Sequence, residues 1–322
     1  MVTFGVTIPQ RGALMGLGEL PELLELAPLA EATGRFDSVW VGDSLTAKPR
    51  PEAVALLGVL AGMTDHVRLG VGCMASFPVR DPAVFAYQWA TLDRASGGRM
   101  LLAACTGIVS ADRASDREGG HWGGVKDLDR PARMVENMAI CRALWTGEEV
   151  TYDGRFHQYR DLQILPAPQQ DPCPIWIAAN PVPGRFWERS LRRVARRADG
   201  YMTTSMVPGL LAQSVTDLAP LLAEEGKSAD TFPVMAYHNL NIGPDREACL
   251  EESQRFLDAY YGPVFTPEMT RTWTAAGTPD ECVDQLNALI EAGATTITLR
   301  FTSWDQRGQL ARAVEEVLPR LS

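Results

Sequence analysis

Residues 88–107, QWATLDRASGGRMLLAACTG, decide the fold class of this 322-residue chain. An apolar helix face runs into Asp93, a double-glycine turn follows, and a short apolar strand then runs from Met100 to Cys105. The strand ends on Thr106 and a glycine rather than on a surface turn. Because the carboxyl ends of parallel barrel strands carry the chemistry of such folds, this stretch predicts a buried strand that leads into a functional face.

The same alternation of strand and helix extends over most of the chain. The pattern predicts strands at residues 2–8, 38–41, 67–74, 99–105, 175–179, 200–203, 232–242 and 295–301, with helices at 20–32, 51–63, 82–95, 130–144, 188–197, 210–225, 246–261, 278–291 and 309–318. Eight strands separated by helices favour an α/β fold, a closed (β/α)8 TIM barrel.

Residues 145–174 interrupt this rhythm after the fourth strand–helix unit. Two short alternating segments flank Asp153-Gly154, which is a hairpin signal. Four prolines between residues 166 and 174 then predict a stiff connector. We therefore expect one barrel domain over residues 1–322, with residues 145–174 as an inserted excursion.

Charge and cysteine spacing exclude several classes of function. A net charge of −10 argues against nucleic acid or an anionic membrane as partner, because both require clustered cations. The six cysteines form no Cys-x-x-Cys pair and the four histidines no His-x-His pair, so we expect no metal site. The N-terminus lacks the basic and apolar segments of a signal peptide, which favours the cytoplasm.

Three titratable residues are candidates for catalysis. Asp43 ends the second strand, where a carboxylate is either functional or pairs with an arginine. His121 stands beside Trp122 in a glycine-rich loop, residues 108–125, which we expect to act as a mobile lid over the site. His238 lies within the seventh strand, where a core histidine is the alternative to a catalytic one. Cys105 is interpreted as a buried thiol that borders the site without acting as a nucleophile.

Several longer stretches, taken together and in this order, resemble a known family. They are FGVTIP, FDSVWVGD, VRLGVGCM, RDPAVFAYQWATLDRASGGRMLLAACTG, ENMAICRALWTGEEVTYDGRFHQ, LPAPQQDPCPIWIAAN, RRVARRADGYMTT and GTPDECVDQLNALIEAGATTITL. On these stretches the chain resembles the bacterial-luciferase-like flavin oxidoreductases, which include FMN-dependent monooxygenases and enzymes that use the deazaflavin coenzyme F420. The resemblance covers most of the chain.

This resemblance implies a flavin or deazaflavin bound at the carboxyl-terminal mouth of the barrel. Its ring would lie near the ends of the second to fourth strands, and its phosphate near the ends of the fifth and sixth. The cofactor-binding residues that the resemblance implies are Cys73, Met74, Cys105, Thr106, Ala179, Asn180, Thr203 and Thr204. The resemblance also implies a non-proline cis peptide at Cys73–Met74 or one residue to either side.

The chain departs from the family pattern at two places. Many members carry a histidine directly after the acid of the second strand, and this chain has Ser44 there. Deazaflavin-dependent alcohol and sugar dehydrogenases use that histidine for acid–base work, so an enzyme of that kind is disfavoured. Ala178 and Ala179 replace two glycines that usually precede Asn180, which weakens the phosphate assignment.

The resemblance leads to three functional hypotheses. The favoured one is a monooxygenase in which reduced FMN, supplied by a separate flavin reductase, reacts with O2 and oxygenates a small organic substrate. The alternative is a coenzyme F420-dependent hydride-transfer oxidoreductase, and the third is a non-catalytic flavin-binding homologue. Ser44 favours FMN, because serine cannot replace a histidine as an acid or base near neutral pH. We also expect a homo-oligomer.

Overall fold

The computed structural model describes residues 2–107, 113–180, 184, 187–204 and 207–321. The chain divides into two compact units. The discontinuous unit consists of Met1–Trp40 and Ala179–Ser322, and the continuous unit is Val41–Ala178. Each unit is described by itself below.

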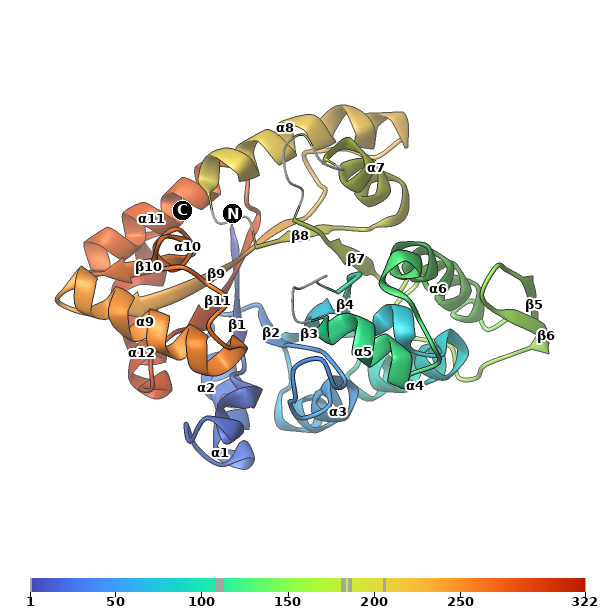
Figure 1. Cartoon of the computed structure of the whole chain (residues 1–322), viewed down its shortest axis with the longest axis horizontal. Coiled ribbons are helices and arrows are strands. Elements are labelled where there is room, and N and C mark those ends of the chain that lie inside the picture. Colours follow the sequence, from blue (N-terminus) through green and yellow to red (C-terminus); the bar gives the residue numbers. More distant parts are fainter. Residues whose placement is uncertain (1, 108–112, 181–183, 185–186, 205–206, 322) are drawn as a thin grey trace. The chain divides into compact units, whose positions relative to one another are not determined.

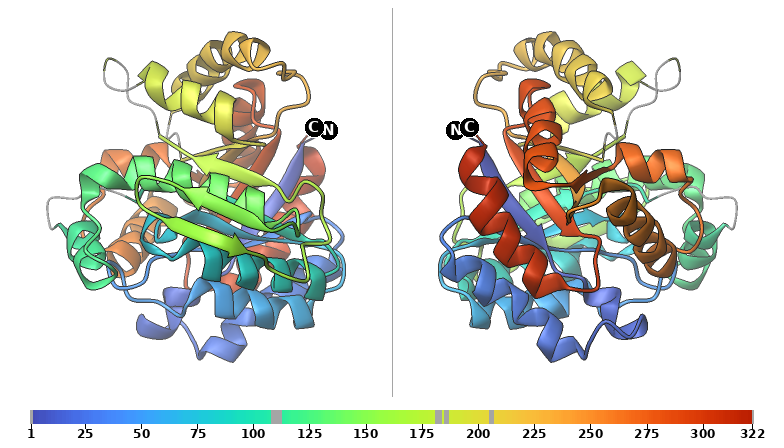
Figure 2. Two further views of the ribbon diagram at one scale, coloured as in Figure 1. Left: turned by 90° about the vertical axis from the view of Figure 1, so that its right-hand side faces the viewer. Right: turned by 90° about the vertical axis from the view of Figure 1, so that its left-hand side faces the viewer.

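Parallel strands from both ends of the chain form the sheet of the discontinuous unit. These strands are β1 (Thr3–Thr7), β2 (Ser38–Val41, whose last residue begins the continuous unit), β8 (Tyr201–Thr203), β9 (Val234–Ile242), β10 (Thr274–Gly277) and β11 (Thr296–Phe301). β1 pairs with β2 on one side and with β11 on the other. β9 pairs with β11, β8 and β10 (Figure 1). Figure 2 shows β1 and β11 side by side although they lie at opposite ends of the sequence.

Close packing around β1 explains the glycine of the opening FGVTIP segment. A Cβ atom on Gly5 would lie 2.6 Å from Thr298 Oγ1 and 2.7 Å from Trp40 Nε1. Gly5 is paired with Thr298 of β11 and Ser38 of β2, so these side chains share one face of the sheet. Glycine therefore lets large side chains of the neighbouring strands fill that face.

Helices of the discontinuous unit follow the predicted order. They are α1 (Leu20–Leu24), α2 (Leu26–Ala32), α7 (Trp187–Arg197), α8 (Pro208–Glu224), α9 (Arg246–Tyr261), α10 (Pro267–Thr272), α11 (Pro279–Glu291) and α12 (Gln306–Arg312). α11 begins with a capping box, in which Glu281 N–H donates to Thr278 Oγ1 and Thr278 N–H donates to Glu281 Oε2 at 2.8 Å.

The continuous unit holds three further parallel strands and the predicted excursion. β3 (Arg68–Met74), β4 (Met100–Ala104) and β7 (Ile175–Ala178) pair in the order β3-β4-β7. The helices are α3 (Ala53–Met63), α4 (Pro82–Ala95), α5 (Ala114–His121) and α6 (Arg130–Leu144). The predicted hairpin is confirmed, because β5 (Val150–Asp153) and β6 (Gln158–Leu162) pair in antiparallel fashion (Figure 2).

Asp93, in the stretch that decides the fold, fixes the proline-rich connector. Its carboxylate is fully buried and accepts hydrogen bonds from the backbone N–H groups of Gln169 and Gln170, at 2.7 and 2.9 Å. The Gln170 side chain also donates to Met100 O at 2.8 Å. The Asp93 carboxylate thus ties the connector to α4, and the Gln170 side chain ties it to the start of β4.

The predicted fold class is confirmed: the chain is a (β/α)8 barrel, in which β1, β2, β3, β4, β7, β8, β9 and β11 are the barrel strands. That residues 1–322 form a single domain stays a prediction. In the described part of the chain, none of the helices has the length and apolar character needed to cross a membrane.

Several details differ from the sequence prediction, among them the last helix, which is expected at 309–318 and is found as α12 at Gln306–Arg312. The helix expected at 20–32 is divided at Glu25, and α3 begins after Pro51 with Glu52 as its N-cap. α10 and β10 lie in a stretch expected to be loop. The expected loop at 108–125 contains α5, on which Glu118 is buried. Residues 108–112 of that loop lie outside the described residues.

Candidate functional site at the strand ends

Asp43 follows β2 and is buried. Its carboxylate accepts a hydrogen bond from Ser76 N–H at 2.7 Å and lies 3.3 Å from Arg80 Nη2. Arg80 also pairs with Glu52 at 2.6 Å. Burial raises the pKa of Asp43, and Arg80 and Ser76 oppose that shift. Of the two interpretations of Asp43, catalytic residue or partner of an arginine, the geometry therefore favours the second.

Ser44 also makes contacts within its own loop. Its Oγ donates to Lys48 O at 2.6 Å and accepts from Lys48 N–H at 3.2 Å. The hydroxyl therefore closes a tight turn after β2. No imidazole takes part in this turn, which agrees with the departure from the family pattern.

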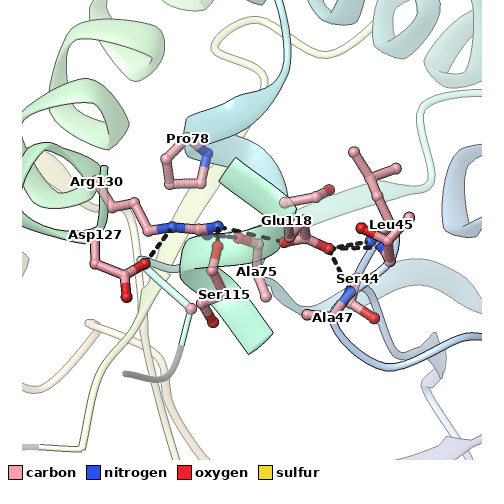
Figure 3. A network of polar contacts seen from close by, with 12 residues as sticks. Ser44, Leu45, Ala47, Ala75, Pro78, Ser115, Glu118, Asp127 and Arg130 are labelled. Carbon is pink, nitrogen blue, oxygen red and sulfur yellow. Dashed lines mark hydrogen bonds and ion pairs between the residues drawn. The ribbon is translucent and has the colours of Figure 1, made fainter. Parts of the chain in front are cut away.

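A buried ion pair joins this turn to the segments that follow β3 and β4 (Figure 3). Glu118 Oε1 accepts hydrogen bonds from three consecutive backbone N–H groups, those of residues 45–47, at 2.7, 2.9 and 3.1 Å. Its other oxygen lies 3.4 Å from Arg130 Nη2. Arg130 in turn donates to Ala75 O and Ser115 O, at 3.1 and 2.6 Å.

Both members of this pair are almost fully buried, with side chains exposed by 1% and 2%. Sequence reasoning missed them. Glu118 lies among glycines in a stretch without apolar periodicity, and Arg130 looks like an ordinary charged residue at a helix start. A buried charge is retained where it is paired and hydrogen-bonded, as here. The pair holds three strand-end segments together.

Cys73, Met74, Cys105 and Thr106 lie together at the ends of β3 and β4. The two sulfur atoms are 2.7 Å apart, and Cys105 N–H donates to Met74 O at 3.4 Å. Met74 is buried in the core, whereas Cys73 and Thr106 are partly exposed. The structure therefore brings together these four of the expected cofactor-binding residues.

The expected cis peptide at Cys73–Met74 is wrong. The cis bonds among the described residues are Leu165–Pro166 and Asp171–Pro172. At the expected position Cys73 instead has a left-handed backbone, with φ of 62°. The β3–β4 register shifts between Val71 and Met74, so the irregularity in the strand is taken up by a bulge-like turn of the chain.

In the discontinuous unit, Asn180 follows β7 and contacts the end of β8. Its Oδ1 accepts from Thr203 Oγ1 at 3.0 Å and from Thr204 N–H at 2.8 Å. Ala179 N–H donates to Met202 O at 3.0 Å. These contacts fix the Asn180 side chain, which is exposed, and direct its amide nitrogen away from both threonine donors. The predicted grouping of these residues is therefore observed within this unit.

The two candidate histidines lie in different surroundings. His238 is 5% exposed and is paired with Leu299, whereas the next residue, Asn239, is paired with Arg300. Because side chains alternate along a strand, His238 and Arg300 lie on opposite faces. Burial lowers the pKa of His238 to about 4. These surroundings favour the core-histidine interpretation. His121 is exposed at the end of α5.

A second buried polar cluster, on the Arg300 face of β9 and β11, was also missed. The Arg300 side chain donates to the hydroxyls of Tyr237 and Tyr261. Its guanidinium carbon lies 4.7–5.5 Å from the ring centres of Tyr237, Tyr260, Tyr261 and Trp273. The alternation of side chains along a strand could have indicated this cluster. It places Tyr237 and Asn239 on the opposite face of the sheet from His238.

Comparison with known proteins identifies the family. A sequence model of the luciferase-like monooxygenase family matches residues 2–296. An F420-dependent glucose-6-phosphate dehydrogenase from Beutenbergia cavernae is 30% identical over 333 residues, covering 93% of each chain.

Two solved structures share the fold. An F420-dependent secondary alcohol dehydrogenase in complex with an F420–acetone adduct has a TM-score of 0.83 at 19% identity, covering 100% of this chain and 99% of that one. A monooxygenase from Streptomyces bottropensis has a TM-score of 0.80 at 22% identity, covering 98% of this chain and 99% of that one. Because the family model matches residues 2–296 and the fold is shared, the chain belongs to the luciferase-like monooxygenase family.

Proposed function

We propose that the protein is a coenzyme F420-dependent oxidoreductase that transfers a hydride to or from a small organic substrate. The observation that carries this proposal is the 30% identity, over 93% of both chains, to a protein named for its use of F420. It favours the F420 alternative over the FMN monooxygenase that Ser44 alone suggests. When bound, the deazaflavin supplies the hydride chemistry, and the protein supplies binding and orientation.

The described residues fit such a cofactor in each unit. In the discontinuous unit, Asn180 Oδ1 is held by Thr203 and Thr204, so its amide N–H group is available to a phosphate oxygen. In the continuous unit, the partly exposed Cys73 and Thr106 offer a thiol and a hydroxyl at adjacent strand ends. We propose the first group as a phosphate contact and the second as a contact for the ring.

The contacts of Ser44 and Asp43 bear on which class of substrate the enzyme can use. Oxidation of a sugar or an alcohol requires a base for the hydroxyl proton, and the residue at the family's histidine position is Ser44. Its hydroxyl is engaged with Lys48, and Asp43 is engaged with Ser76 and Arg80. We therefore propose reduction of an activated double bond, such as a conjugated carbonyl compound, rather than oxidation of glucose 6-phosphate.

Two cofactor titrations test the proposal. The purified protein should bind oxidised F420 in the micromolar range, and FMN more weakly. Asn180→Asp preserves the oxygen acceptor but replaces the amide donor with a second carboxylate oxygen, so it should weaken F420 binding by about tenfold or more. Asn287→Asp makes the same charge change on α11 and should leave the affinity within twofold. FMN binding without F420 binding would refute the proposal.

Turnover separates the substrate classes. Reduced F420 should be oxidised by conjugated carbonyl compounds, whereas oxidised F420 with glucose 6-phosphate should show no reduction. Reduction of F420 by glucose 6-phosphate would contradict the substrate proposal while supporting the choice of cofactor.

FMN monooxygenation is the second candidate function, because Ser44 disfavours the dehydrogenase chemistry. O2 consumption dependent on reduced FMN, a flavin reductase and substrate would support it.

A further inference from the structure

Two cysteines from adjacent parallel strands place their sulfur atoms in contact. Cys73 lies near the end of β3 and Cys105 directly follows β4, and Sγ–Sγ is 2.7 Å. Both are free thiols. A disulfide bond measures about 2.05 Å, so oxidation requires only a small approach of the two atoms.

The backbone holds the two thiols at this distance. β3 and β4 are paired from Leu69 with Met100 to Met74 with Ala104, and the register shifts just where Cys73 occurs. Cys73 has a φ of 62°, which is uncommon for a residue with a side chain. This conformation gives the Cys73 side chain a direction that regular strand alternation would not give it. The contact is thus built into the strand ends.

Hydrogen bonding gives the two sulfurs different roles. The Cys73 thiol donates to Cys105 Sγ, and Gly107 N–H donates to the same sulfur at 3.2 Å. The hydrogen bond to Cys105 and burial raise the pKa of Cys73. Cys105 Sγ is the acceptor in both contacts. Cys73 is partly exposed, which gives a small oxidant access to the pair.

We propose that Cys73 and Cys105 are a redox modification site that forms a reversible disulfide with a hydroperoxide as oxidant. With hydrogen peroxide, two S–H bonds and the O–O bond break, one S–S bond forms, and two molecules of water leave. The two thiols lose two electrons, which the peroxide gains. A thiol reductant restores both cysteines by thiol–disulfide exchange.

The expected consequence for the cofactor rests on the proposed function. Cys73 belongs to the group proposed to contact the deazaflavin ring, and a disulfide with Cys105 moves its sulfur and draws the two strand ends together. Oxidation should therefore weaken F420 binding by about fivefold or more. Reduction should restore it.

Thiol counting on the cofactor-free, full-length protein tests the disulfide directly. After limited peroxide treatment and denaturation, the number of titratable thiols should fall from six to four, and peptide mass spectrometry should find residues 73 and 105 cross-linked. Cys249→Ala removes a buried thiol elsewhere and should leave the cross-link intact. Cys73→Ser and Cys105→Ser should abolish it. Six remaining thiols, or sulfinic acid at either residue without a cross-link, would overturn the proposal.

A second measurement separates this site from the proposed function. F420 affinity is measured for the oxidised protein, for the reduced protein, and for oxidised protein treated with dithiothreitol. A cross-link that forms while neither state binds F420 would refute the proposed function and leave the redox site standing. A cross-link that forms with equal F420 affinity in both states would refute the link between oxidation and cofactor binding.

Discussion

At the scale of single residues, Asp43 shows how a strand-end carboxylate can serve the structure. Its side chain is 1% exposed, and Ser76 N–H and Arg80 are its partners. These contacts connect the segment after β3 to the end of β2.

Replacing Asp43 with asparagine should therefore affect stability more than cofactor binding. The asparagine oxygen can still accept from Ser76 N–H, but the charge beside Arg80 is lost, which should cost about 1–3 kcal/mol of unfolding free energy. Urea unfolding measures this, and F420 affinity should stay within twofold. Asp153→Asn, at a side chain exposed by 72%, is the control and should cost less than about 0.5 kcal/mol. Loss of F420 binding by a stably folded Asp43→Asn would restore a direct role for this residue.

His238 predicts how stability depends on pH. Its pKa in the folded protein is lowered from 6.5 to about 4 by burial. The unfolded chain therefore binds the proton more readily, and stability falls as pH decreases from about 6.5 towards 4. The expected loss from this residue between pH 7 and pH 5 is about 2 kcal/mol. His238→Leu should remove that part of the pH dependence in urea unfolding, and His66→Leu, at an exposed position, should keep it. Parallel pH profiles for wild type and His238→Leu would contradict this account.

At the scale of elements, α5 is held by one carboxylate. Glu118 connects this helix to residues 45–47 and to Arg130. Glu118→Gln removes the charge from a nearly fully buried position and places amide hydrogens near donors. We expect backbone hydrogen exchange to accelerate about tenfold or more in residues 114–126 and 45–47, with the β5–β6 hairpin unchanged. Glu149→Gln, at an exposed site, should change none of these rates. Unaltered exchange in α5 would show that other contacts fix the helix.

The elements that the sequence predicts correctly are those with strong periodicity or clear end signals. α4 and α6 match their predicted bounds, and the capping box of α11 is present as expected. α5, α10 and β10 were missed because they are short and carry little apolar periodicity. Their formation depends on tertiary contacts, such as those of Glu118, which no local pattern contains.

The candidate site, like the fold, could be predicted only in part. Residues that the family resemblance implies, such as Cys73 with Cys105 and Asn180 with Thr203, are in contact. The identity of the arginine that pairs with Asp43, and the pairing of Glu118 with Arg130, could not be found, because no motif or local periodicity marks these residues.

At the scale of the whole molecule, the interrupted layout of the discontinuous unit has a consequence during synthesis on the ribosome. β1 is made long before its partner β11, since Thr3 pairs with Thr296, 293 residues further along the chain. All of Val41–Ala178 has been translated before most of the other unit exists. At about 5–20 residues per second, translation of residues 179–322 takes roughly 7–30 s. For that interval β1 lacks the strand that completes its pairing, and an unpaired strand edge of this kind is where a nascent chain is prone to aggregate and where a chaperone can act.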